Sequence, residues 1–151
     1  MLFGPTAREA LLLATTEPAR RTLVLDLVDA FSKAFPAISY DVYWDTRTAN
    51  AQAFTLHGRQ HVRLMGGLAR HVRVSEAGLA WTLAHETGHH LATGAPHPND
   101  LQVRDEAAAD AWAPDGLRIV FGEAVGHNYA DRGARDMNAF RLDLDNFDQH
   151  T

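Results

Sequence analysis

The segment from His85 to His89 reads His-Glu-Thr-Gly-His, and this H-E-x-x-H pattern constrains the fold more than any other part of the chain. On an α-helix, residues four apart differ by about 40° of rotation and about 6 Å of rise. The imidazoles of His85 and His89 therefore project from one face of a helix, close enough to bind one metal ion. Glu86 lies beside them and can act on a metal-bound water without being a ligand.

A catalytic zinc ion usually takes three protein ligands and leaves one position for water, so the pattern needs a third ligand elsewhere. The best candidate is Glu106, which lies in an alanine-rich segment that favours a helix. Asp110 lies four residues later on the same face and can accept a hydrogen bond from the outer ring nitrogen of a zinc-bound histidine. The alanines between these two acids would let the second helix approach the first closely.

Other residues remain candidates for the third ligand. His97 follows His89 by eight residues, and Asp110 could itself be the ligand. A metzincin pattern would need glycine at position 92 and His or Asp at position 95, but this chain has alanine at both. Asp105 points about 100° away from Glu106, and His90 turns away from the metal. In the plainest alternative, the helix merely carries polar side chains and Glu106 belongs to a solvated acidic face.

The H-E-x-x-H pattern and the pair of acids at Glu106 and Asp110 together resemble the pattern of the gluzincin clan of zinc metallopeptidases. In that clan one helix carries H-E-x-x-H, and the next carries a glutamate ligand with an aspartate four residues later. The residues that match are His85, Glu86, His89, Glu106 and Asp110. The resemblance implies an endopeptidase that binds one Zn²⁺ per protomer and cleaves a peptide or protein substrate.

A longer stretch, from Ala49 to Ala113, resembles the HtpX and CAAX-prenyl-endopeptidase family. The segments that carry this resemblance are residues 50–54, 61–68 and 75–90. Members of that family often have transmembrane helices, and this chain has no apolar run near the ~18 residues that a span needs. The chain is therefore more similar to a soluble catalytic core, such as the minigluzincins or the ImmA-like peptidases.

The chemistry of such a site assigns further roles. Glu86 would take the proton of the attacking water and pass it to the leaving amine. A second donor to the tetrahedral intermediate is expected downstream, where His127 and Tyr129 are the candidates, with Arg132 and Arg135 as weaker ones. Substrates of zinc peptidases bind extended, along a sheet edge. The candidate residues for this edge are Gln60, His61, Val62, Arg63 and Leu64.

Composition limits the classes of function. The 151 residues suggest a single domain, here taken as 1–151, with 46% hydrophobic and 22% charged residues. A net charge of −5 and a pI near 5.9 argue against nucleic-acid binding. Cysteine is absent, so no disulfide or cysteine-ligated zinc is possible. No signal peptide is visible, and a cytoplasmic location is the default expectation.

Periodicity and turn residues predict an α+β fold, in which a small twisted sheet packs on helices. The resemblance implies that this fold is zincin-like, with a mixed sheet packed on the two ligand-bearing helices. Strands are expected at 38–44, 51–56 and 60–64, with a tight turn at His57-Gly58. Ser75 should cap the metal helix and Gly94 should end it, while Pro114 should end the next helix. Expected helices cover 6–14, 17–35, 75–93, 99–113, 116–125 and 132–142, with a loop at 126–131.

Several remaining residues have simpler interpretations. His57, His61 and His71 are expected on the surface, and Trp81 and Trp112 in the core. Gly88, inside a helix, indicates close packing against a neighbour. Two alternatives to a peptidase stay open: a degenerate or regulatory zincin domain that binds a partner protein with little hydrolysis, and a metal-dependent amidase on another substrate.

Overall fold

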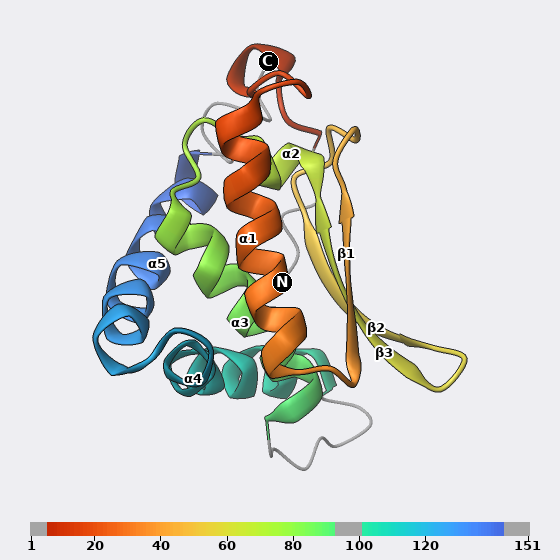
Figure 1. Cartoon of the computed structure of the whole chain (residues 1–151), viewed down its shortest axis with the longest axis vertical. Coiled ribbons are helices and arrows are strands. Elements are labelled where there is room, and N and C mark those ends of the chain that lie inside the picture. Colours follow the sequence, from red (N-terminus) through yellow and green to blue (C-terminus); the bar gives the residue numbers. More distant parts are fainter. Residues whose placement is uncertain (1–5, 93–100, 144–151) are drawn as a thin grey trace.

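Helices and a small β-sheet form separate layers, which confirms the α+β class (Figure 1). The computed structural model describes residues 6–92 and 101–143, and of residues 101–105 and 142–143 only the backbone. Within these ranges the elements are a 3₁₀ turn at Glu9–Leu11, α1 (Pro18–Ala34), β1 (Ile38–Tyr43), β2 (Ala51–Leu56), β3 (Arg59–Met65), α2 (Gly66–Ala69), α3 (Glu76–Leu91), α4 (Leu101–Phe121) and α5 (Glu123–Asp143).

The sheet has the strand order β1-β3-β2, so β3 is its central strand. It pairs with β1 in parallel and with β2 in an antiparallel hairpin. As predicted, the hairpin turns at His57 and Gly58, which have φ angles of 51° and 78°. Because both sides of β3 are paired, the prediction that residues 60–64 form the open edge is wrong. The edges of the sheet are β1 and β2.

The burial of β3 explains its central position. Val62 and Leu64 are each 1% exposed, so both need apolar neighbours on either side. Tyr40 of β1 lies opposite Val62 on one side, and Ala51 of β2 lies opposite Leu64 on the other. The parallel partner is distant in the sequence, so the local pattern of residues 60–64 does not reveal it.

Helix α3 runs through the middle of the molecule (Figure 1). It contacts α1, β2 and β3 on one side and α4 and α5 on the other. Most of its length is buried, from Ala77 to Gly88. The largest side chains of the surrounding core with less than 2% exposure include Phe31, Leu64, Leu68, Leu79, Leu83, Leu117 and Phe140. The residues of the H-E-x-x-H pattern therefore lie on a helix that is buried and packed against both the sheet and other helices.

The C-terminal helices are longer than predicted. Helix α4 continues through Pro114 to Phe121, and α5 includes the residues expected to form a loop at 126–131. The two helices separate at Gly122, which has a φ of 87°. Proline inside a helix costs about 3 kcal/mol, but Ala113 and Leu117 on either side of it are fully buried. Packing against the core therefore keeps the helix continuous.

The N-terminal segment also differs from the prediction, because residues 6–14 contain one 3₁₀ turn in place of a helix. Tertiary contacts hold this segment in position. The buried Arg70 guanidinium donates hydrogen bonds to the carbonyl groups of Leu13 and Trp44, both at 2.9 Å. Among the helices of the described residues, none is long and apolar enough to span a membrane.

Candidate metal centre

The position of α3 is fixed at its N-terminus by Ser75, as predicted. The Ser75 hydroxyl accepts a hydrogen bond from the backbone N–H of Gly78 at 3.0 Å and donates one to Asp136 of α5 at 2.7 Å. A serine at this position satisfies one of the unpaired N–H groups that begin every helix. The contact with Asp136 also ties α3 to α5. The described part of the chain shows α3 ending at Leu91.

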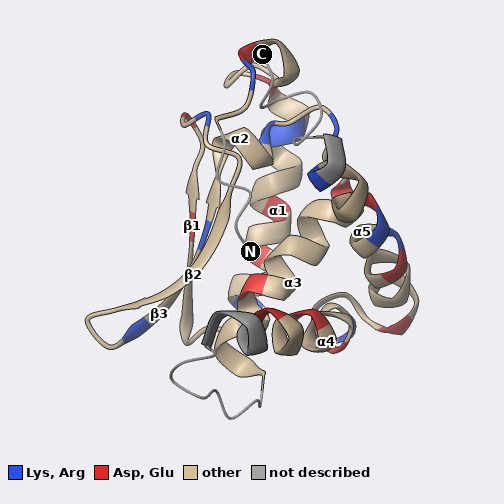
Figure 2. Cartoon of the chain, turned by 180° about the vertical axis from the view of Figure 1, so that it is seen from behind, with Lys and Arg blue, Asp and Glu red and all other residues tan. Residues whose placement is uncertain are grey.

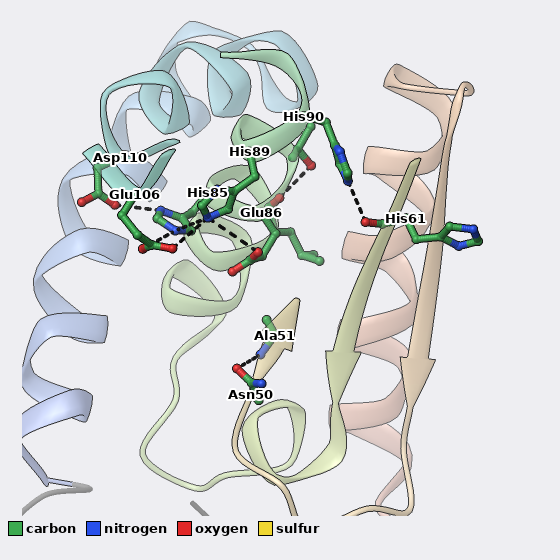
Figure 3. Close-up of polar contacts among 11 residues, drawn as sticks. Asn50, Ala51, His61, His85, Glu86, His89, His90, Glu106 and Asp110 are labelled. Atoms are coloured by element: carbon green, nitrogen blue, oxygen red, sulfur yellow. Dashed lines mark hydrogen bonds and ion pairs between the residues drawn. The ribbon is translucent and has the colours of Figure 1, made fainter. Parts of the chain in front are cut away.

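Three side chains bring potential metal-ligand atoms together where α3 meets α4 (Figure 3). His85 Nε2 lies 3.2 Å from His89 Nε2 and 3.1 Å from a carboxylate oxygen of Glu106. His89 Nε2 lies 2.9 Å from the other oxygen of Glu106. Tetrahedral ligands roughly 2.0–2.1 Å from a zinc ion are about 3.3 Å apart. The two imidazole nitrogens and the carboxylate group therefore form a triangle of groups with about the dimensions of the base of a tetrahedral site, in which a different Glu106 oxygen lies nearest to each imidazole.

Glu86 belongs to the same cluster but lies farther from the ligand atoms. Its carboxylate is 4.0 Å from His89 Nε2, and its side chain is 1% exposed. A grouping of His85, Glu86 and His89 alone would also offer three ligand atoms, within 4.8 Å of one another. Glu106 fits the ligand position better because its oxygens are nearer to both imidazoles. Burial raises the pKa of the Glu86 carboxyl above its usual value, against the opposing effect of the two histidines.

Asp110 contacts the His85 ring at Nδ1, and Trp81 packs on the face of the ring. An oxygen of Asp110 lies 2.7 Å from His85 Nδ1. The two atoms do not form a hydrogen bond in this structure, and the contact is a close approach of the carboxylate to the ring nitrogen. The Trp81 ring stacks on His85 with centroids 5.1 Å apart. The arrangement agrees with the role predicted for Asp110, and Trp81 is a core residue as expected.

The charges of the cluster depend on one another. Burial by itself would raise the pKa of Glu106, but hydrogen bonds from His85 and His89 outweigh it and hold this pKa well below its usual range. The pKa of His89 is raised: burial alone would lower it, and the hydrogen bond to Glu106 and the charge of Glu86 more than offset this. Glu106 is therefore a carboxylate anion, the form that binds a cation.

Gly88 allows α4 to come this close to α3. A Cβ atom at this position would lie 3.1 Å from the Cα atom of Ala109 and 3.2 Å from the Trp112 ring. The interpretation that Gly88 indicates close packing is confirmed. The small side chain of Ala109, which is fully buried, completes the contact from the α4 side. The result is that Glu106 and Asp110 reach the imidazoles of α3.

The sheet edge beside this cluster is β2. Figure 3 shows Asn50 and Ala51, at the start of β2, on the side of Glu86. The Asn50 carbonyl accepts the N–H of Met65, which belongs to β3. Bonding alternates along an antiparallel pair, so Ala51, Ala53 and Thr55 direct their backbone groups away from β3.

The predicted downstream donors lie elsewhere. The Tyr129 ring packs against Phe121 with centroids 5.0 Å apart, and its pKa is raised by burial and by Glu76. Glu76 begins α3, ten residues before Glu86, a distance of about 15 Å along the helix. His127 lies two residues before Tyr129 on α5 and is exposed. The structure therefore does not bring these two residues to the metal centre.

The other histidines vary in their surroundings. His90 turns toward the sheet, as expected, and its Nε2 lies 2.7 Å from the carbonyl oxygen of His61. His57 is exposed, whereas His61 is half-buried and stacks on Phe54 with ring centroids 5.0 Å apart. The prediction that His71 lies on the surface is wrong: it is fully buried. It packs against Phe140 of α5, a contact that no local pattern predicts.

The alternative ligand His97 lies outside the described residues, as does Gly94. The side chain of Asp105 is also outside them. Comparisons of the chain with protein-family models, with curated proteins and with solved structures find no match. The case for a metal centre therefore depends on the chemistry and geometry of its own side chains.

Proposed function

We propose that this protein is a zinc-dependent endopeptidase of the gluzincin type. The observation that carries the proposal is the triangle of groups formed by His85 Nε2, His89 Nε2 and the Glu106 carboxylate, with separations of 2.9–3.2 Å, in which a different Glu106 oxygen lies nearest to each imidazole. Two neutral imidazoles and one carboxylate are a usual ligand set for catalytic zinc. Zinc bound there would lower the pKa of water and polarise the carbonyl of the scissile bond.

Glu86 is the proposed general base. Its carboxylate lies beside the ligand triangle without being part of it, 4.0 Å from His89 Nε2. It would accept the proton of the attacking water and pass this proton to the amine that leaves. Burial raises its pKa, and a base with a pKa closer to neutrality holds the proton more readily between these two transfers.

The open edge of β2 is the proposed binding site for the substrate backbone, in place of β3. An extended peptide can add to a sheet edge through main-chain hydrogen bonds. Ala51 and Ala53 direct their backbone groups to this edge, close to Glu86. The Asn50 side-chain oxygen accepts the N–H of Ala51 at 2.9 Å, which satisfies one of these groups internally. The carbonyl of Ala51 and both backbone groups of Ala53 would pair with substrate.

The test combines metal analysis with peptide cleavage. The purified wild-type protein should contain about one zinc ion per protomer and cleave casein or a peptide library, and a chelator should abolish cleavage. Glu86→Gln should keep the zinc and lose activity by about 10²–10⁴-fold. Glu123→Gln, which changes an exposed glutamate on α5, is the matched control and should remain fully active.

Each outcome separates the alternatives. A Glu86→Gln variant that keeps both zinc and activity would show that the reaction does not use this base. If the zinc-loaded wild type binds peptides without cleaving them, the regulatory zincin domain replaces the peptidase. Loss of zinc together with activity in Glu86→Gln would make Glu86 a ligand.

A further inference from the structure

A hollow lies beside the metal centre, between α4 and α5. It has a volume of about 570 Å³, and its lining includes Trp81, Asp110, Pro114, Arg135, Asn138 and Arg141. Trp81 and Asp110 are also the residues that hold the His85 ring, by stacking and by a contact of 2.7 Å to Nδ1. The hollow and the metal centre therefore share a wall.

Helix α5 supplies positive charge to this hollow. Arg135, Asn138 and Arg141 follow one another at spacings of three residues, and all three line the hollow. Figure 2 shows charges of both signs along α5, and acidic residues along α4. The carboxylate of Asp110 is directed at His85, and that of Asp131 lies 3.6 Å from Arg135. Both side chains of the Asp131–Arg135 pair are exposed, so this ion pair contributes little free energy.

Two guanidinium groups and an amide are suited to a carboxylate ligand. Arginine presents a planar set of N–H donors that matches the two oxygens of a carboxylate. The Asn138 amide can add a further donor. The walls formed by Trp81 and Pro114 would exclude water from one side of the ligand. The chemistry of the lining thus favours an anionic group on a short side chain or chain end.

The hollow also lies in the direction that a substrate would follow. Helix α5 and strand β2 lie on opposite sides of α3 (Figures 1 and 3). The cluster lies between them, so a substrate that is held at β2 and crosses the cluster reaches the side of α3 on which α5 lies. The part of the substrate that enters the hollow is therefore on the far side of the cleaved bond from β2.

We propose that the hollow between α4 and α5 is a specificity pocket for a carboxylate of the substrate, bound by Arg135 and Arg141. This inference rests on the proposed peptidase function and adds a substrate class to it. The carboxylate has two possible sources: an acidic side chain next to the cleaved bond, or the free C-terminus of a short peptide.

Matched fluorogenic peptides separate the two sources. One pair carries Glu or Gln immediately after the scissile bond, and a second pair ends there in a free or an amidated C-terminus. The wild type should prefer the carboxylate member of one pair, by roughly 10-fold in kcat/KM, the lower range for hydrogen bonds to charged groups at a half-open site. The pair that shows the preference identifies the source.

Variants then assign the preference to the hollow. Arg135→Gln combined with Arg141→Gln should remove it, by lowering kcat/KM for the carboxylate peptide and leaving its neutral partner unchanged. Lys33→Gln also removes one cation, from an exposed position on α1, and should change neither rate. An equal loss for both peptides of a pair would assign the arginines to catalysis or folding, and would overturn the proposal.

A binding measurement keeps this inference separate from the proposed function. Calorimetric titration of the wild type with N-acetylglutamate should show binding that N-acetylglutamine and the double arginine variant lack. If the protein cleaves no peptide but shows this binding, the peptidase proposal fails and the carboxylate site remains. If it cleaves peptides without any carboxylate preference and binds neither probe, the carboxylate site fails and the peptidase remains.

Discussion

At the scale of single residues, the two acids of α4 act on the same histidine in different ways. Glu106 lies 3.1 Å from His85 Nε2, the nitrogen directed at the proposed metal position, whereas Asp110 lies 2.7 Å from Nδ1 on the other side of the ring. A carboxylate at Nδ1 keeps the proton on that nitrogen and leaves Nε2 to bind metal. The spacing of four residues is what lets one helix supply both contacts.

We expect Asp110→Asn to weaken zinc retention or turnover by about 10–100-fold while the fold survives, because the His85 ring loses its charged acceptor. The measurement is a chelator-competition titration of the purified variant. Asp115→Asn is the control, since Asp115 lies on the same helix but is exposed and paired with Arg118. Equal effects of the two substitutions would contradict the role of Asp110.

The identity of the third ligand leads to a second prediction. Glu106→Ala should lose most of its zinc, because two imidazoles alone leave the site one protein ligand short. His97→Ala should keep its zinc, as measured by metal analysis after dialysis. The reverse result would make His97 the ligand, and the gluzincin assignment would be wrong.

At the scale of elements, the metal centre depends on the close approach of α3 and α4. Alanine in place of Gly88 would gain about 1 kcal/mol of helix propensity in an isolated helix. Here its Cβ atom would lie 3.1 Å from both the Cα and the carbonyl oxygen of Ala109. Backbone atoms cannot rotate away as a side chain can, so the two helices must separate. Such overpacking costs typically 1–3 kcal/mol.

Gly88→Ala should therefore lower the melting temperature and weaken zinc binding together, because Glu106 moves away with α4. Thermal melts in the presence and absence of zinc measure both effects. A variant that is more stable than the wild type and binds zinc equally well would show that the helices are not in close contact at this point.

At the scale of elements, some features of the fold can be predicted from the sequence and others cannot. The candidate cluster follows from two spacings of four residues, His85–His89 on α3 and Glu106–Asp110 on α4. The two-residue turn at His57-Gly58 follows from local backbone preference. The central position of β3 depends on a parallel partner more than twenty residues away. The continuity of α4 through Pro114 depends on the burial of the residues on either side of this proline. Local sequence patterns reveal neither of these two features, because both result from packing between distant segments.

At the scale of the whole molecule, the proposed metal would join α3 to α4 through ligands from both helices. The proposed ligands come from α3, which contacts the sheet and three other helices, and from α4, which begins at Leu101. Three of the cluster residues, His85, Glu86 and His89, are buried or nearly so in the middle of the fold. The thermal stability of the whole chain should therefore depend on metal binding.

We expect zinc to raise the melting temperature of the wild type, since a ligand at 1,000 times its Kd stabilises the folded state by about 4 kcal/mol. For a chain of this length each kcal/mol shifts the melting temperature by roughly 2–4 °C, so removal of zinc should lower it by about 10 °C. Glu86→Gln should show the same shift, because the base is not a ligand, and His85→Ala should show none. An unchanged melting temperature in the wild type, at a zinc concentration that fills the site by metal analysis, would mean that the metal binds folded and unfolded chains equally and does not join α3 to α4.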